Sequence, residues 1–204
     1  MMNDSKIQVI EKPDWVSWDE IHNVLWEAHR QNREKGMNMR LPAMSGDELC
    51  VFIGGRGKMY VAMDDEKVIG TLALIIKEGK QWFNRGRYGY ACLGAVLPEY
   101  SGKGVFRALY DKIEAEAIRM QLPIITRDTH ESNVRMLKIS KQEGYRFVSY
   151  KACKDHFNIV RAKWLNDCPF PSWYIKTRFV FSKIFVKARY RMDSQKGKVK
   201  RFGI

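Results

Sequence analysis

A glycine-containing turn is the part of the sequence whose residue types and spacing most clearly suggest chemistry. It lies in the stretch from Leu93 to Phe106, LGAVLPEYSGKGVF, between a predicted strand and a predicted helix. The first turn of a helix carries N–H groups without intrahelical acceptors, at the positive end of the helix dipole. Gly102 and Gly104 would let several of these amides point into one concavity, and Lys103 adds positive charge. The turn therefore predicts a phosphate-binding site, although a plain strand–turn–helix connection also explains the two glycines.

Two common nucleotide-binding motifs are excluded for this turn. A P-loop requires Gly-Lys-Ser/Thr, and no such triplet follows the glycines. A dinucleotide fingerprint requires a third glycine at the start of a parallel β-α-β unit, with an acidic residue on the second strand. Neither pattern is present here.

The same stretch resembles motif A of the GNAT superfamily of acyl-CoA-dependent N-acetyltransferases, which reads Val-x-Pro-x-x-Arg-Gly-x-Gly-x-Gly/Ala. The matching residues are Val96, Pro98, Gly102 and Gly104. Farther along, Asn133, followed after ten residues by Gly144-Tyr145, resembles motif B of the same superfamily. The two motifs stand in the family's order and at its separation, so the resemblance predicts the GNAT fold.

The resemblance implies acetyl-CoA as co-substrate and direct transfer of its acetyl group to an amine in a ternary complex. The family binds the CoA pyrophosphate on amides of the glycine turn, here Gly102, Lys103, Gly104, Val105 and Phe106. It also implies that Val96 pairs with the pantetheine arm, that Asn133 lies beside the cofactor, and that a backbone donor near Gly94 faces the oxyanion. A β-bulge without a ligand is the alternative for Gly94, and a helix N-cap is the alternative for Asn133.

Three residues depart from the family pattern. Ser101 stands in place of Arg or Gln, Phe106 in place of a small residue, and Ser140 in place of the family's frequent general-acid Tyr. The first two leave the backbone amides unchanged, although a Phe106 ring close to the turn would crowd the pyrophosphate. Ser140 cannot replace a phenol as an acid. Tyr145 and Tyr150 are then candidates by residue type only, and solvent could carry the proton instead.

An amine must lose its proton before it attacks a thioester, so the reaction needs a general base or a site that disfavours the ammonium form. Some family members carry a carboxylate six residues before the motif-A valine, at the position of Tyr90. Tyr90 could relay a proton through water, or simply pack on the sheet. Asp128 and His130 end the strand before motif B, and His130 titrates near neutrality. His130 could equally be a loop histidine that caps the next helix.

Hydrophobic periodicity predicts the elements that must position these residues. Strands are expected over residues 6–12, 58–63, 68–76, 88–96, 123–127, 145–153 and 156–163. Helices are expected over 18–29, from a capping box at Ser45 and Glu48, over 104–120 and over 131–143, with a loop at 36–44. Antiparallel hairpins before a β-α-β unit predict an α/β (α+β) fold, with a mixed, mostly antiparallel sheet of GNAT type flanked by helices.

Positive charge is concentrated at the C-terminal end of the chain. The formal net charge is +13, and residues 173–204 contain ten Lys/Arg and one Asp. We expect a GNAT-like acyl-CoA-binding domain at 1–166 and a basic, aromatic, helical extension at 167–204. The extension could lie on an anionic membrane, hold an acidic partner, form a homodimer or dock on the domain, whereas nucleic acid is the least favoured partner.

Other features limit the class of protein. Apolar residues make up 45% and charged residues 29%, which excludes a disordered chain. No apolar run is long enough for a spanning helix. The four cysteines and four histidines are scattered, so no metal is expected. The N-terminus lacks the pattern of a secretion signal, and a cytoplasmic protein is expected.

The sequence therefore predicts an N-acetyltransferase that moves an acetyl group from acetyl-CoA to an amine of a small molecule. The alternative is a catalytically idle GNAT-fold domain that binds CoA or serves as a membrane or partner interaction module. The glycine turn favours the enzyme, whereas Phe106 and Ser140 favour the idle domain.

Overall fold

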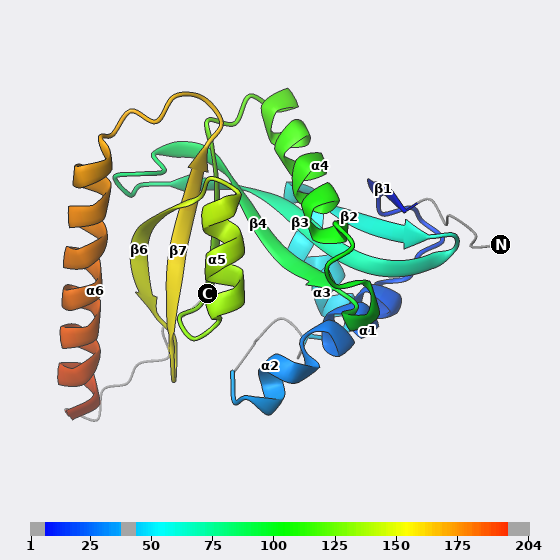
Figure 1. Ribbon diagram of the computed structural model, residues 1–204, viewed down its shortest axis with the longest axis horizontal. Helices are drawn as coiled ribbons and strands as arrows, with labels where there is room; N and C mark the ends of the chain where they lie inside the picture. The colour runs from blue at the N-terminus through cyan, green and yellow to red at the C-terminus, as the bar shows by residue number, and fades with distance from the viewer. Residues whose placement is uncertain (1–6, 38–43, 196–204) are drawn as a thin grey trace.

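Seven strands form a single mixed sheet in the computed structural model, which describes residues 7–37 and 44–195 (Figure 1). The strands lie in the order β1-β2-β3-β4-β5-β7-β6, and every neighbouring pair is antiparallel except β4 and β5. Their bounds are β1 Gln8–Glu11, β2 Gly57–Asp64, β3 Lys67–Gly79, β4 Gly86–Val96, β5 Ile124–His130, β6 Arg146–Ala152 and β7 Phe157–Trp164. The mixed, mostly antiparallel sheet predicted from the sequence is confirmed.

The helices of the described residues are α1 Trp18–Ala28, α2 Arg30–Glu34, α3 Gly46–Ile53, α4 Val105–Arg119, α5 Val134–Gln142 and α6 Ser172–Gln195. Short 3-10 turns, η2 Gly54–Arg56 and η3 Pro98–Tyr100, precede β2 and follow β4. The predicted capping box begins α3. The Ser45 N–H lies 2.8 Å from Glu48 Oε2, and the Glu48 N–H lies 3.2 Å from Ser45 Oγ.

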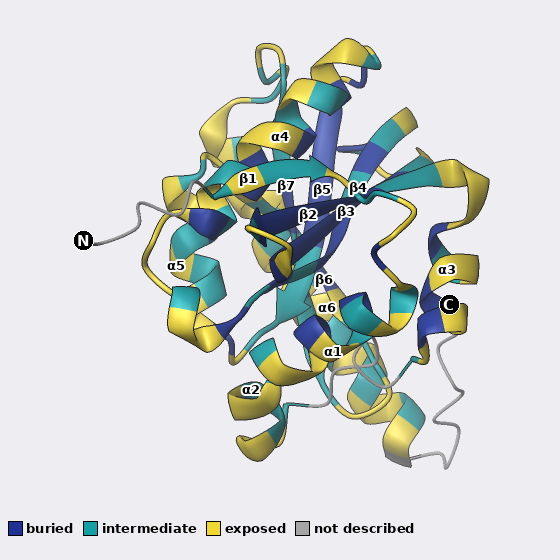
Figure 2. Cartoon of the chain, turned by 90° about the vertical axis from the view of Figure 1, so that its right-hand side faces the viewer, coloured by how far each residue is buried: buried dark blue, intermediate teal, exposed yellow. Residues whose placement is uncertain are grey.

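Helices cover both faces of the sheet. On one face α1 and α3 pack through Leu25 and Leu49, both completely buried. On the other face α4 packs through Leu109 and Ile113, which are also completely buried. Figure 2 shows the buried central strands between α4 and α1. Each such side chain contributes roughly 1.5–3 kcal/mol by leaving water, so the sheet is a rigid support for its own loops.

The helix predicted over residues 18–29 is interrupted at its end. α1 stops at Ala28, and His29, at φ −98° and ψ 6°, leaves the helical conformation before α2 begins. The next residues, Arg30–Glu34, form a separate short helix. The predicted loop that follows lies mostly at residues 38–43, outside the described residues.

The C-terminal extension is helical, as predicted, and packs on the edge strand β6. Ile175 is buried, and Ser182 Oγ accepts the Tyr150 N–H at 2.9 Å. Tyr190 Oη donates to the Lys154 carbonyl at 3.0 Å, near the other end of α6. In Figure 1 α6 stands at the outer edge of the sheet, beside β6. No helix within residues 7–37 and 44–195 has both the length and the apolar character needed to cross a bilayer.

Candidate functional site

The parallel strands β4 and β5 pair over a short distance and then diverge. Among the described residues, the ladder between β4 and β5 consists of two pairs, Gly89 with Ile125 and Tyr90 with Thr126. The β5-facing edge of β4 from Ala91 to Val96 therefore keeps backbone N–H and C=O groups that the sheet does not use. Such an edge can hydrogen-bond an extended ligand.

A β-bulge lies within this open part of β4. Leu93 has φ +56°, and the register with β3 shifts at this point. Thr71 Oγ1 donates to the Leu93 carbonyl at 2.8 Å and fixes the bulge. A Cβ on Gly94 would lie 3.1 Å from the Leu72 side chain and 3.4 Å from the Phe106 ring, so only glycine fits without displacement. The bulge considered for Gly94 is present, and its role as an oxyanion donor stays a prediction.

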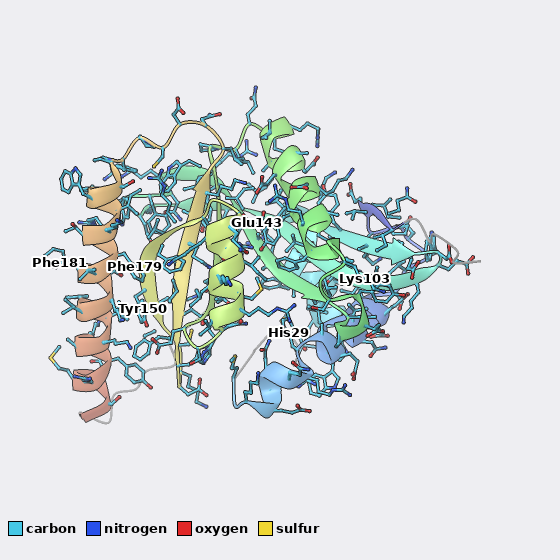
Figure 3. The ribbon with its side chains drawn as sticks, viewed as in Figure 1. His29, Lys103, Glu143, Tyr150, Phe179 and Phe181 are labelled. Carbon is cyan, nitrogen blue, oxygen red and sulfur yellow. The ribbon has the colours of Figure 1, made fainter. Side chains whose placement is uncertain are left out.

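His29 reaches the bulge from the junction of α1 and α2. Burial lowers the pKa of its imidazole to about 4, and a hydrogen bond to the backbone of Gly94 offsets this only in part. The ring is therefore neutral at pH 7. Asn32 Nδ2 lies 3.2 Å from His29 Nδ1, and Figure 3 draws His29 between α1 and α5. No local pattern in the sequence predicts this contact, because it joins residues far apart in the chain.

The N-terminus of α4 presents free amides beside the bulge. Gly102 and Gly104 have φ +84° and +79°, and Gly104 caps α4 without any side-chain hydrogen bond. The first-turn N–H groups thus have no acceptor within the described residues. Lys103 lies at the same turn, with Nζ 4.7 Å from the Tyr100 ring (Figure 3). The combination suits a phosphate anion.

The two residues that depart from motif A do not obstruct these amides. The Phe106 ring packs against Tyr110, with centroids 4.8 Å apart, and lies toward Gly94 on the sheet side of α4. Ser101 receives a hydrogen bond from the Arg135 guanidinium at the start of α5. A cation is therefore held next to the turn even though Ser101 stands where the motif has Arg.

A tyrosine–carboxylate pair lies where β4 and β5 begin to diverge. Tyr90 Oη donates to Asp128 Oδ1 at 2.6 Å, and Asn158 Nδ2 lies 3.3 Å from Asp128 Oδ2. Lys151 Nζ lies 3.7 Å from the same carboxylate, and Lys77 Nζ lies 3.9 Å from the Tyr90 ring. Burial, and next the charge of Asp128, raise the pKa of Tyr90 well above its usual value. The phenol is therefore a donor, and Asp128 is the group of this pair that can accept a proton.

A family model described as the acetyltransferase (GNAT) family matches residues 18–145, more than half of the chain. The chain belongs to the GNAT acetyltransferase family. The sequence matches no curated protein sequence.

Solved structures confirm the GNAT fold. A GNAT-family acetyltransferase from Staphylococcus aureus Mu50 superposes with a TM-score of 0.62 at 15% identity, covering 79% of this chain and 100% of that one. The ribosomal-protein-S18-alanine N-acetyltransferase of Escherichia coli superposes with a TM-score of 0.60 at 13% identity, covering 80% of this chain and 96% of that one. A GNAT acetyltransferase from Elizabethkingia anophelis with acetyl-CoA bound superposes with a TM-score of 0.57 at 14% identity, covering 79% of this chain and 99% of that one. Each of these matches thus leaves about a fifth of this GNAT chain uncovered.

His130 and Asn133 are both site candidates from the sequence. His130 is the last residue of β5, and Asn133 is the N-cap of α5. His130 Nδ1 accepts the Ser132 N–H at 3.1 Å, and its ring stacks on His156 with centroids 4.7 Å apart. Burial, then the neighbouring His156, lower the pKa of His130. Asn133 caps α5 by accepting the Met136 N–H at 3.1 Å. The N-cap alternative accounts for Asn133, whereas His130 is the last residue of β5 and accepts an N–H that precedes α5, so it does not cap the helix. The roles of both residues toward base or cofactor stay predictions.

Of the hydroxyl groups considered as acids, that of Tyr145 is buried without a hydrogen-bond partner among the described residues, and those of Tyr150 and Ser140 form hydrogen bonds. Tyr145 is buried, with the Arg127 guanidinium 3.9 Å from its ring. Tyr150 Oη donates to Glu131, close to α6. Ser140, at the motif-B tyrosine position, is completely buried and contacts Arg161 and the Met136 carbonyl.

Ser140→Ala should leave the turnover number within about threefold of the parent, because a buried hydroxyl held by Arg161 cannot deliver a proton to a leaving thiolate. It should instead lower stability by roughly 1–2 kcal/mol, because Arg161 loses a buried partner. Steady-state kinetics and thermal unfolding of the same preparation check both results. A loss of turnover of a hundredfold or more, the size of a working general acid, would contradict this assignment.

Another chemistry could come from Cys92, because it lies beside the bulge, or from a bound metal ion. Burial raises the pKa of the Cys92 thiol to about 12, so this residue next to the bulge is not a thiolate at neutral pH. No group of three His, Cys, Asp or Glu side chains among residues 7–37 and 44–195 could hold a metal ion. A covalent route through Cys92 is therefore disfavoured.

Proposed function

We propose that the chain is an acetyl-CoA-dependent N-acetyltransferase that acetylates an amine of a small molecule by direct attack in a ternary complex. The observation that carries the proposal is the set of unpaired amides at the N-terminus of α4, beside the unpaired edge of β4. The high pKa of the nearby Cys92 thiol supports direct attack over an acyl-enzyme.

The cofactor would be held by backbone groups at the glycine turn and along β4. Amides from Gly102 to Phe106 would hold the pyrophosphate, except that of Lys103, which donates to the Tyr100 carbonyl at 3.3 Å, and the Lys103 and Arg135 side chains would supply positive charge. Val96 and the edge of β4 would pair with the pantetheine arm. When bound, acetyl-CoA supplies the thioester. The position of Phe106 away from the first-turn amides supports this placement.

The remaining groups would activate the amine and stabilise developing charge. A primary amine titrates near 10, so only about one molecule in a thousand is neutral at pH 7. The Asp128 carboxylate would bind the ammonium form and accept its proton, with Tyr90 holding the carboxylate in place. A backbone N–H at Gly94 would donate to the carbonyl oxygen as charge develops. His29 would be a positioning residue, because its hydrogen bond holds the Gly94 backbone.

A catalytically idle domain that binds CoA is the second candidate function. One observation favours it: the position of the family's general-acid tyrosine is Ser140, which is buried. In an active enzyme, the leaving thiolate would then have to take its proton from solvent or from the reacting amine.

Acetyl-CoA at about a hundred times its Kd should raise the melting temperature by roughly 5–10 °C, since such saturation adds about 2.7 kcal/mol. Acetyl-pantetheine, which lacks the pyrophosphate, is the control and should stabilise far less at the same concentration. Release of free CoA on a panel of small amines then identifies an enzyme. Stabilisation without CoA release on any amine would favour the idle domain, and no stabilisation at all would refute both candidates.

A further inference from the structure

Helix α6 has two apolar faces, of which the domain covers only one. The inner face packs on β6 through Ile175 and Phe179, and the Phe179 ring lies 5.7 Å from that of Phe147. We call the other side the outer face. It consists of Trp173, Val180, Phe181, Ile184, Phe185 and Met192. Figure 3 shows Phe179 directed toward the sheet and Phe181 directed away from it.

The apolar residues of the outer face gather on one side of α6, together with the polar side chains of Thr177 and Arg191. Its members form two adjacent rows along α6, Trp173-Val180-Ile184 and Phe181-Phe185-Met192, each with spacings of four and seven positions, so they lie on one side of the helix. Trp173, Phe181 and Phe185 are 68%, 66% and 67% exposed. Large contiguous apolar patches are unusual on monomeric soluble proteins and mark binding surfaces.

Cationic side chains flank the outer face on both edges. Lys176, Lys183 and Lys187 follow one edge at spacings of seven and four residues, and Arg178 and Arg189 follow the other. Lys187 pairs with Glu131 at 3.1 Å, and Arg189 lies 3.8 Å from Asp193. No carboxylate among the described residues forms an ion pair with Lys176, Arg178 or Lys183.

A hollow beside α6 combines both kinds of side chain. Phe181 and Phe185 line it together with Lys80, Arg85 and Arg178. Two of these cations come from the β3–β4 turn, far from α6 in the sequence, so the fold assembles the charge around the helix. Aromatic rings beside Lys/Arg suit the boundary between lipid headgroups and acyl chains.

We propose that α6 binds an anionic lipid bilayer, with the outer face in the headgroup region and the flanking Lys/Arg on lipid phosphates. A second copy of the chain fits less well. A two-fold pairing would bring the same cationic edges together, and Asp193 is the only acid in α6. The phosphates of a nucleic acid would pair with the flanking Lys/Arg side chains but would leave Val180, Ile184 and Met192 exposed to water. The proposal does not depend on the proposed acetyl transfer.

The test is co-sedimentation of the full chain with vesicles. Binding to phosphatidylcholine vesicles containing phosphatidylglycerol is expected to be at least about tenfold tighter than binding to phosphatidylcholine alone, and to weaken with added salt. The double variant Phe181→Asp/Phe185→Asp should lose at least about tenfold in binding, because it places charge at the acyl boundary. Val51→Asp/Ile118→Asp is the matched control with the same change in net charge, since Val51 of α3 and Ile118 of α4 are apolar residues that are 78% and 60% exposed.

A second pair of variants separates local charge from total charge. Lys176→Gln/Arg178→Gln/Lys183→Gln should lose about tenfold or more in binding, whereas Lys35→Gln/Lys67→Gln/Lys112→Gln should lose much less at the same net charge. Equal losses in the two triple variants would overturn the proposal, as would equal binding to both kinds of vesicle. A dimer in light scattering that Phe181→Asp/Phe185→Asp dissociates, without vesicle binding by the parent, would assign the face to a second copy. Unchanged stabilisation of these variants by acetyl-CoA keeps the result separate from the proposed function.

Discussion

Gly104→Asp is expected to abolish the stabilisation of the chain by acetyl-CoA. Gly104 is the N-cap of α4, and the free first-turn amides lie directly beyond it. A carboxylate at this position would satisfy those amides itself and would repel a pyrophosphate. No atom lies within 4 Å of a Cβ at Gly104, so the side chain fits without a clash. We expect the Kd for acetyl-CoA to rise at least about a hundredfold, equivalent to about 2.7 kcal/mol.

Gly104→Asn is the matched control for this variant. Asn has the shape of Asp, carries no charge and tolerates the left-handed conformation that φ +79° imposes. Both variants meet the same backbone strain, of about 1–2 kcal/mol, so their difference isolates the charge. Isothermal titration should give Gly104→Asn a Kd within about tenfold of the parent. Equal affinities of the Asp and Asn variants would show that the anion binds elsewhere.

Local sequence signals predicted the part of the site that one segment builds. The strand end, the two glycines and the start of α4 are consecutive, and helix N-termini follow from short-range rules. Ser45 and Glu48 are a second example, because the capping box involves residues three apart and forms as expected. In both cases the residues that determine the geometry are close neighbours in the chain.

Contacts between distant segments could not be predicted in this way. The hydrogen bond of His29 to the Gly94 backbone joins the end of α1 to β4, which is far away in the sequence. The pairing of Tyr90 with Asp128 depends on the register of β4 with β5, which places Tyr90 beside Thr126. The two strands were predicted, but nothing local specifies their register.

Which side of α6 is buried and which is exposed could also be learned only from the fold. Apolar residues occur on both sides of the helix, so its periodicity is weak and does not tell which side is buried. Contact with Phe147 on β6 selects Phe179 for the interior and leaves Phe181 outside. The choice among the partners proposed for the extension depends on this distinction, because the exposed side then carries aromatic and aliphatic residues between two rows of cations.

Asp128→Asn should lower the turnover number about a hundredfold to a thousandfold on an amine that the parent acetylates. A general base contributes about 10²–10⁴ in rate, and Asn cannot accept a proton. The amide oxygen of Asn can still accept the Tyr90 hydroxyl, so the local structure should persist. The Kd for acetyl-CoA should stay within about threefold of the parent, because Asp128 lies on β5 and the anion site lies at α4.

Tyr90→Phe is the comparison that distinguishes proton transfer from positioning. This variant keeps the Asp128 carboxylate and removes the donor that orients it at 2.6 Å, so turnover should fall by about tenfold or less. A base at Asp128 therefore predicts a much larger loss for Asp128→Asn than for Tyr90→Phe, with acetyl-CoA affinity preserved in both. If Asp128→Asn keeps turnover within a few-fold of the parent, the carboxylate takes no proton, and the rate depends on how β4 and the bulge position the reactants.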